Sequence, residues 1–363
     1  MGVGPVVVGL DTLGIMRAVT IQKQGAPVAP NIVAVSDWPE AAAPGQGQVV
    51  VRTECSALNH MDLWVGMGIP GVDLTYPRIS GCDACGIVES VGSGVDPAWV
   101  GQRVIVNAAY DVVRPVRPSD PPASSYRRDL ELIGEHVHGM HAERFSVPAE
   151  NLALVGPSAD PVEAAAFGLT FLTAWSMMTT KGWLRPGQSV LITGIGGGVA
   201  TAALAIATWM ACPVVVTSRH QWKLDRAREL GASHGVLDTG DDWSKAVRSW
   251  TGGRGVDMVV DTIGKPTHLK SIKSLARGGA FVTAGNTGGP IVETDQARMF
   301  WNQLRLLGST MGTTTELREL AALFRAGRLK PVVDSVHPWK DARGAWERLE
   351  AADQFGKVVL DWR

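Results

Sequence analysis

Residues 190–200 combine a short run of aliphatic, largely β-branched residues with a cluster of glycines, and an apolar, alanine-rich segment follows up to residue 211. A strand that turns tightly into a helix lets the backbone approach a pyrophosphate, whose charge then lies against the free N–H groups of the helix N-terminus. The residues of this turn are Gly194, Gly196, Gly197, Gly198 and Val199. A second β-branched run, at residues 214–217, begins about 20 residues later, at the spacing of a ribose-recognition position. The sequence therefore predicts a dinucleotide site.

The end of this second run predicts which dinucleotide binds. NAD sites usually place Asp or Glu there, to accept hydrogen bonds from the ribose hydroxyls. This chain has Ser218 and Arg219, with Lys223 one turn into the next predicted helix, and no acid occurs between residues 214 and 222. Ser can donate a hydrogen bond to a 2′-phosphate, while Arg and Lys neutralise its charge. The pattern favours NADP(H) over the alternative, a solvated basic start of a helix.

Composition excludes several classes of protein. The chain has 363 residues and a net charge of −1, with 19% charged residues, so no basic surplus points to a nucleic acid or an anionic membrane. No apolar run approaches the roughly 20 residues of a membrane helix. Four irregularly spaced cysteines do not form a disulfide framework and predict a cytoplasmic location. Residues 1–15 lack the features of a signal peptide and are predicted to be an extension.

The elements that position these residues change character near residue 167. The first part is rich in short strands and turns, with little helical periodicity; its expected strands are 48–52, 86–91, 103–106 and 144–148, and residues 111–127 are expected to form a long polar loop. From there to residue 312, strands alternate with helices such as 221–231 and 242–250; the expected strands are 189–193, 213–217, 234–237, 256–261, 279–284 and 304–309. Two helices (316–326 and 342–352) and a strand (357–361) follow. This order predicts an α/β protein with a doubly wound, six-stranded parallel sheet and a second, β-rich domain.

Several motifs together resemble the medium-chain dehydrogenase/reductase superfamily over residues 16–363, in particular its zinc-free quinone oxidoreductase-like or "zinc-binding dehydrogenase" subgroup. The similar stretches are the glycine turn and residues 57–62, 81–86, 91–92, 169–175 and 354–360. The resemblance implies a GroES-like catalytic domain (16–167 plus 313–363) and a Rossmann domain (168–312). It also implies a homodimer that pairs through the edge strand at 303–310. By the same resemblance, further cofactor-binding residues are Thr173, Thr262, Ile263, Gly285 and Lys357.

Departures from the zinc enzymes of this superfamily predict that no metal binds. Asn59 replaces the first cysteine ligand, Cys82 replaces the ligand histidine, and the third ligand position falls at residues 169–170. The loop of four cysteines that holds structural zinc would lie near 107–130, where the chain has no cysteine. Cys82 and Cys85 are expected to be buried core thiols.

Two metal alternatives stay open. One is an atypical zinc on Cys82, Asp83 and His60, which requires three protein ligands, although neighbouring side chains on a strand point to opposite faces. The other is a site among four residues of one loop, otherwise read as a polar loop with His138 and His141 partly solvated. Those four residues are Glu135, His136, His138 and His141.

The zinc-free branch implies reduction of the double bond of an α,β-unsaturated carbonyl or a quinone, because an enolate needs only hydrogen-bond donors. By resemblance, Asn59 lies beside the nicotinamide, and Asp62 is a structural acid or orients a donor. Tyr110 and His136 are the candidate proton donors. Trp64, near Asn59, would suit a small hydrophobic substrate. Two other functions stay open: an NADP-dependent alcohol dehydrogenase or carbonyl reductase with an atypical zinc site, and a cofactor-binding, redox-sensing protein with little turnover.

Overall fold

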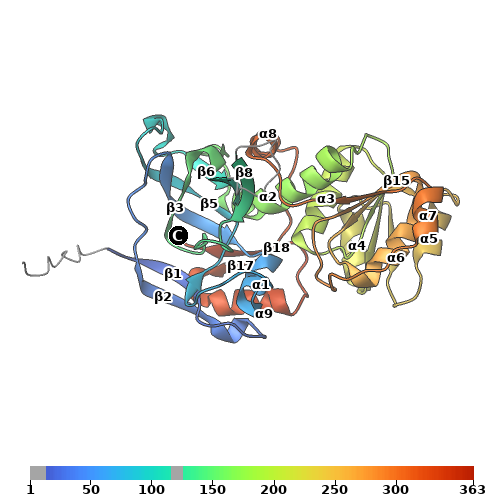
Figure 1. Cartoon of the computed structure of the whole chain (residues 1–363), viewed down its shortest axis with the longest axis horizontal. Coiled ribbons are helices and arrows are strands. Elements are labelled where there is room, and N and C mark those ends of the chain that lie inside the picture. The colour runs from blue at the N-terminus through green and yellow to red at the C-terminus, as the bar shows by residue number, and fades with distance from the viewer. Residues whose placement is uncertain (1–13, 116–125) are drawn as a thin grey trace, which may run out of the picture.

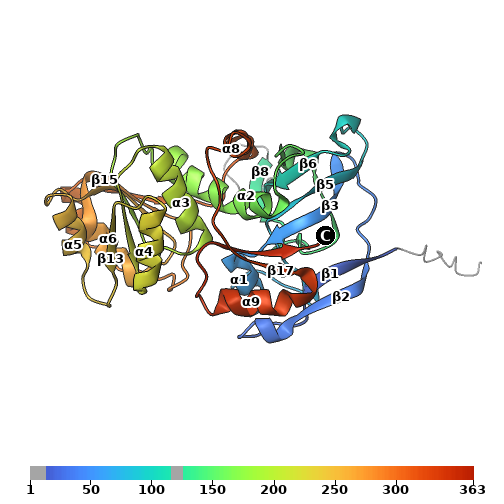
Figure 2. The same cartoon turned by 180° about the vertical axis from the view of Figure 1, so that it is seen from behind.

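The computed structural model describes residues 14–115 and 126–363, which form a β-rich part and a part built on a parallel sheet (Figure 1). In both views the C-terminal strands lie among strands from the first hundred residues, far from the orange end of the parallel sheet (Figure 2). The chain therefore leaves the β-rich part, builds the parallel sheet and then returns.

The described strands of the parallel sheet follow the order β13-β12-β11-β14-β15-β16. They are β11 (Val190–Ile192), β12 (Val214–Ser218), β13 (His234–Leu237), β14 (Val256–Asp261), β15 (Leu275–Thr283) and β16 (Arg305–Gly308). The central strands are aliphatic and buried, as expected of a parallel sheet covered by helices on both faces. The accompanying helices are α3 (Gly198–Trp209), α4 (Gln221–Glu229), α5 (Ser244–Trp250), α6 (Lys265–Ser274) and α7 (Gln296–Trp301). The predicted doubly wound fold is confirmed, and its order reverses between β11 and β14, where such sheets bind ligands at the carboxyl ends of their strands.

The β-rich part contains a larger sheet of order β10-β6-β5-β3-β18-β17, with β9 also paired to β3, a small sheet of order β2-β1-β4, and the hairpin β7-β8. The larger sheet is formed by β3 (Gln48–Ala57), β5 (Ala84–Val91), β6 (Arg103–Val106), β9 (Arg144–Pro148), β10 (Leu152–Leu154), β17 (Val333–Pro338) and β18 (Lys357–Asp361). The others are β1 (Ile15–Ile21), β2 (Ile32–Pro39), β4 (Arg78–Ile79), β7 (Ala109–Pro115) and β8 (Tyr126–Leu132). Short 3-10 turns lie at Ala29–Asn31, Pro97–Trp99, Ala149–Asn151 and Trp339–Asp341.

Two helices bring the parts together at the site. Helix α1 (His60–Met67) follows β3 directly, and α2 (Pro161–Trp175) contacts β3, β5 and β18 on one side and α3 on the other. A π-helical turn, Ser176–Lys181, extends α2. Phe167 and Phe171 of α2 are fully buried and stacked, with ring centroids 4.1 Å apart. The remaining helices are α8 (Thr314–Arg325) and α9 (Ala342–Glu350).

Local predictions differ from the structure in three places. The expected polar loop at 111–127 includes parts of both strands of the hairpin β7-β8, while residues 116–125 lie outside the described residues. Helix α1 was not expected, because its eight residues are too few to show a clear apolar period. Helix α2 runs across the predicted domain boundary at 167/168. Most of the predicted N-terminal extension, residues 1–13, also lies outside the described residues.

A search of the described residues finds no helix with the length and apolar character that a bilayer crossing requires.

Candidate active site

A cavity of about 630 Å³ lies between the two parts of the molecule. Its β-rich wall includes Asn59 and Trp64, and its other wall includes Gly194 and Thr262. A cavity of this size, mainly apolar with a few polar groups, is typical of a cofactor or small-molecule site. The cavity meets the carboxyl ends of β11 and β14, where a doubly wound sheet binds its ligand.

The glycine turn forms part of this wall. Gly194 and Gly196 have φ values of +61° and +124°, a backbone conformation that favours glycine. A Cβ at Gly198, the first residue of α3, would lie 2.8 Å from both the Thr170 and Lys357 side chains. Gly197, Gly198, Val199 and Ala200 line the cavity, so an anion bound there would lie beside the N–H groups of the first turn of α3. These residues fit the pyrophosphate of a dinucleotide.

The residues at the end of β12 line the same cavity. Ser218 is buried and Arg219 is exposed, so the guanidinium is free to meet an anionic ligand. Lys223 is buried, and its Nζ donates a 2.7 Å hydrogen bond to the carbonyl oxygen of Ala352. Burial lowers the pKa of Lys223. Asp238 also lines the cavity, but its carboxylate forms a 3.0 Å ion pair with Lys270.

Most other residues predicted to hold the cofactor line this cavity as well. Those residues are Thr173, Gly197, Val199, Thr262, Ile263, Gly285 and Lys357. Gly196 is not among the residues that line the cavity; its carbonyl accepts a 2.9 Å hydrogen bond from the N–H of Gly356. Asp261 shapes the Thr262–Ile263 loop, because one of its carboxylate oxygens accepts hydrogen bonds from the N–H groups of Ile263 and Gly264.

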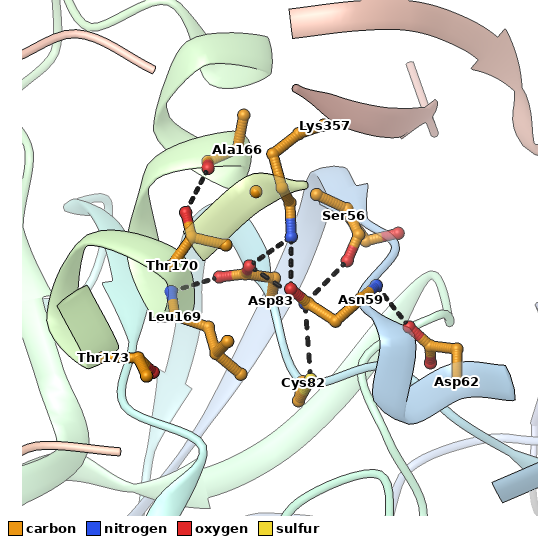
Figure 3. Close-up of polar contacts among 12 residues, drawn as sticks. Ser56, Asn59, Asp62, Cys82, Asp83, Ala166, Leu169, Thr170, Thr173 and Lys357 are labelled. Carbon is orange, nitrogen blue, oxygen red and sulfur yellow. Dashed lines mark hydrogen bonds and ion pairs between the residues drawn. The ribbon is translucent and has the colours of Figure 1, made fainter. Parts of the chain in front are cut away.

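A buried ionic cluster lies at the cavity wall beside Asn59 (Figure 3). Lys357 Nζ donates to Asn59 Oδ1 at 2.5 Å and to Asp83 Oδ2 at 2.9 Å. Asn59 Nδ2 donates to Asp83 Oδ2 at 3.1 Å and lies 3.4 Å from Cys82 Sγ. The N–H of Leu169 in α2 donates to Asp83 Oδ1 at 2.8 Å. The side chains of Lys357 and Asp83 are only 4% and 1% exposed, so both charges depend on this cluster for solvation.

The expectation that Cys82 and Asp83 point to opposite faces is wrong. Both side chains contact the amide of Asn59, because these residues precede β5 and do not follow the alternation of a strand. The predicted burial of the thiols is confirmed, since Cys82 and Cys85 are fully buried. Burial raises the pKa of each thiol well above its usual value.

Asp62 lies behind Asn59, and it does not line the cavity. Its Oδ2 accepts a 2.7 Å hydrogen bond from the backbone N–H of Asn59, and its Oδ1 lies 3.3 Å from Nε2 of His141. His141 Nδ1 lies 2.9 Å from the hydroxyl of Ser56, which also accepts a hydrogen bond from the Trp362 indole. Burial acts to raise the pKa of Asp62, but His141 and the Asn59 N–H outweigh it and hold this pKa below its usual value. This series of contacts, from Asp62 through His141 to Ser56, positions Asn59.

The two candidate proton donors lie away from the described cavity lining. The Tyr110 hydroxyl donates to Glu131 Oε2 at 3.2 Å, and burial raises its pKa. His136 is exposed, and its Nδ1 accepts a hydrogen bond from the N–H of Leu132.

Two acid–base residues do line the cavity. The sequence indicates Glu135 only as a possible metal ligand; in the structure it lines the cavity, and burial raises the pKa of its carboxyl group. His60 packs edge-on against Trp64, and burial lowers its pKa. No sequence motif marks Glu135 as a proton donor. It reaches the cavity only through the fold of the loop that follows β8.

The donor set beside Asn59 does not fit a zinc ion. Both oxygens of Asp83 already accept hydrogen bonds, and a lysine ammonium lies in the group where a second cation would be repelled. The loop histidines have separate partners: His138 Nδ1 accepts from the N–H of Ile79, and His141 is fully buried against Asp62, which corrects its expected solvation. Within residues 14–115 and 126–363, no group of three or more His, Cys, Asp or Glu side chains is placed to hold a metal.

Comparison with known proteins gives two family matches. Residues 45–157 match the alcohol dehydrogenase GroES-like domain, and residues 230–360 match the zinc-binding dehydrogenase family.

Similar proteins cover nearly the whole chain. A zinc-type alcohol dehydrogenase-like protein YogA of Leptosphaeria maculans is 31% identical, over 88% of this chain and 92% of that protein. A 2-haloacrylate reductase of a Burkholderia species is 29% identical, over 95% and 98%. A crystal structure of an NAD-dependent alcohol dehydrogenase is 36% identical, with a TM-score of 0.84, over 96% of this chain and 100% of that one.

Proposed function

This chain belongs to the medium-chain dehydrogenase/reductase superfamily, and we propose that it is an NADPH-dependent reductase of the double bond of α,β-unsaturated carbonyl compounds or quinones. The observation that carries the proposal is the buried polar group beside the glycine turn, in which Asn59 and Asp83 hold the ammonium of Lys357, a hydrogen-bond donor. The similarity to a 2-haloacrylate reductase, named for a conjugated substrate, supports the same reading.

Charge distribution favours conjugate reduction at this site. When bound, the reduced nicotinamide supplies a hydride to the β-carbon of the substrate. Negative charge then develops on the conjugated oxygen, where hydrogen-bond donors can stabilise it. The apolar wall at Trp64 and Leu132 suits a small hydrophobic substrate and excludes water from the developing charge.

The preference for NADPH is proposed from the end of β12. Ser218 and Arg219 line the cavity there, and the nearby acid Asp238 is paired with Lys270. A 2′-phosphate would meet a cation at this end of the cavity, whereas the two ribose hydroxyls of NADH would lack the usual free carboxylate. We also propose a cytoplasmic location, with which the four free cysteines agree.

A screen of cofactor oxidation with matched saturated and unsaturated ketones, and with quinones, tests the proposed reaction. We expect NADPH to be oxidised faster with each unsaturated ketone than with its saturated partner. Faster turnover of the saturated ketones would contradict the proposal and favour the second candidate, an alcohol dehydrogenase or carbonyl reductase, which the names of several relatives suggest. NADPH binding with no turnover of any compound would favour a redox-sensing protein.

We further propose a homodimer that forms along β16. This strand pairs with β15 on one side and is at the end of the described sheet order, so its other edge is open to a second copy. Phe300 and Trp301 at the end of the adjacent α7 are 65% and 71% exposed, which is typical of an interface. Light scattering is expected to give twice the 38.6 kDa chain mass, and Leu306→Lys, in β16, is expected to shift the protein toward monomer. A monomeric mass for the unsubstituted protein at micromolar concentration would rule out this dimer.

A further inference from the structure

The resemblance to zinc enzymes assigns the ligand positions to Asn59, Cys82 and residues 169–170. In this structure the ammonium of Lys357 is bonded to Asn59 and to Asp83, the residue next to Cys82. Asn59 Oδ1 and Asp83 Oδ2 accept two of its hydrogens, at 2.5 Å and 2.9 Å. These residues do not fit a zinc ion for a specific reason: the ammonium of Lys357 already places a positive charge beside them.

We propose that the Lys357 ammonium is the electrophile of this site and donates its remaining hydrogen to the carbonyl oxygen of the substrate. Lys357 lines the cavity together with Gly198 and Asn59, so the group is beside both the glycine turn and the space left for substrate. This inference rests on the proposed function, because it assigns the group that stabilises the charge formed there.

The surroundings hold the ammonium in one place before any ligand arrives. Asp83 keeps a positive charge favourable in a buried position, and Asp83 is itself fixed by the N–H of Leu169. Asn59 is fixed in turn through its N–H to Asp62. A donor oriented in this way loses little free energy in reorganisation when charge develops on a nearby oxygen.

The step balances without a change in the protonation of lysine. A C–H bond forms at the β-carbon as the hydride arrives, and the electron pair of the carbon–carbon double bond moves into conjugation, leaving negative charge on the oxygen. Lys357 holds that oxygen by a hydrogen bond. A proton from water then forms the C–H bond at the α-carbon, and the carbonyl group is restored.

The test compares single and double substitutions, because Lys357→Met alone leaves Asp83 buried without its cation. Lys357→Met with Asp83→Asn removes both charges at similar side-chain size and keeps an acceptor for the Leu169 N–H. Lys330→Met, at an exposed lysine, is the matched control. For each protein the measurements are the thermal midpoint, NADPH affinity by fluorescence, zinc content, and kcat with 2-cyclohexen-1-one and with cyclohexanone.

We expect the double variant to fold and to bind NADPH, with kcat for the enone lower by about 10²–10³, the usual loss on removing one oxyanion donor. Wild-type kcat in the double variant would overturn the inference and leave Lys357 as a neutraliser of Asp83. Loss of NADPH affinity in proportion to kcat would also overturn it, making Lys357 a cofactor-binding residue. One zinc per chain in the unsubstituted protein, lost together with activity, would overturn it as well.

The same measurements test the proposed reaction independently of the role of Lys357. If the unsubstituted protein reduces cyclohexanone and not the enone, the proposed reaction is wrong, and the same loss in the double variant would still support Lys357 as the electrophile. If the unsubstituted protein oxidises NADPH with neither ketone and with no enone or quinone of the wider screen, both proposals are overturned.

Discussion

Asp62→Ala is expected to lower the free energy of unfolding by about 2–5 kcal/mol, because each buried donor left without its acceptor costs roughly 1–3 kcal/mol. The Asp62 carboxylate is almost fully buried, accepts the Asn59 N–H at 2.7 Å and lies 3.3 Å from His141 Nε2. Without it, both donors are left in the interior with no acceptor. Denaturant titration measures the change, and Asp73→Ala, at an exposed acid nearby in sequence, is the control. A loss below 1 kcal/mol for Asp62→Ala would contradict the role given to this carboxylate.

The same carboxylate predicts a dependence of stability on pH. Its pKa in the folded protein lies below the usual value of an aspartate, because His141 and the Asn59 N–H outweigh the effect of burial. A group with a lowered folded pKa contributes stability above its unfolded pKa, and this contribution is lost as pH falls through the folded value. The stability difference between the unsubstituted protein and Asp62→Asn should therefore be constant at neutral pH and shrink below about pH 4. A difference that stays the same down to pH 3 would contradict this assignment.

Arg219→Ala is expected to weaken NADPH binding by about 1–3 kcal/mol and to leave NADH binding unchanged, since a charge-assisted contact to the 2′-phosphate is lost. Arg219 is exposed and lines the cavity, so its guanidinium is open to a bound ligand. Fluorescence titration with both reduced cofactors measures the two affinities. Arg226→Ala is the control, because this residue of α4 is exposed and paired with Glu229 at 2.5 Å. Equal losses for the two cofactors, or tighter binding of NADH by the unsubstituted protein, would remove the basis for NADPH preference.

The parallel sheet could be predicted from sequence because each of its signals is local. An aliphatic run, a glycine turn and an amphipathic or apolar helix recur along the chain, and each strand was located to within a few residues. The backbone conformation of the turn favours glycine, because Gly194 and Gly196 have positive φ values.

The polar cluster could not be predicted in the same way. Lys357 and Asp83 are 274 positions apart, and no period or motif links them. The error about Cys82 and Asp83 came from treating them as strand residues, whereas the strand begins at Ala84. Glu135 reaches the cavity only through the fold of an irregular loop, so its residue type alone gave no signal.

The hydrogen bond between Asn59 and Lys357 also determines when the site can form during synthesis. These residues are 298 positions apart, and β18, which begins at Lys357, pairs with β3. At the usual rate of translation, β3 leaves the ribosome roughly 15–60 s before β18 is made. Throughout that interval the edge of β3 that receives β18 lacks its partner and is open to pairing with another chain. The parallel sheet, in contrast, can form from contiguous sequence, so a nascent chain acquires its glycine turn before it can assemble an active site.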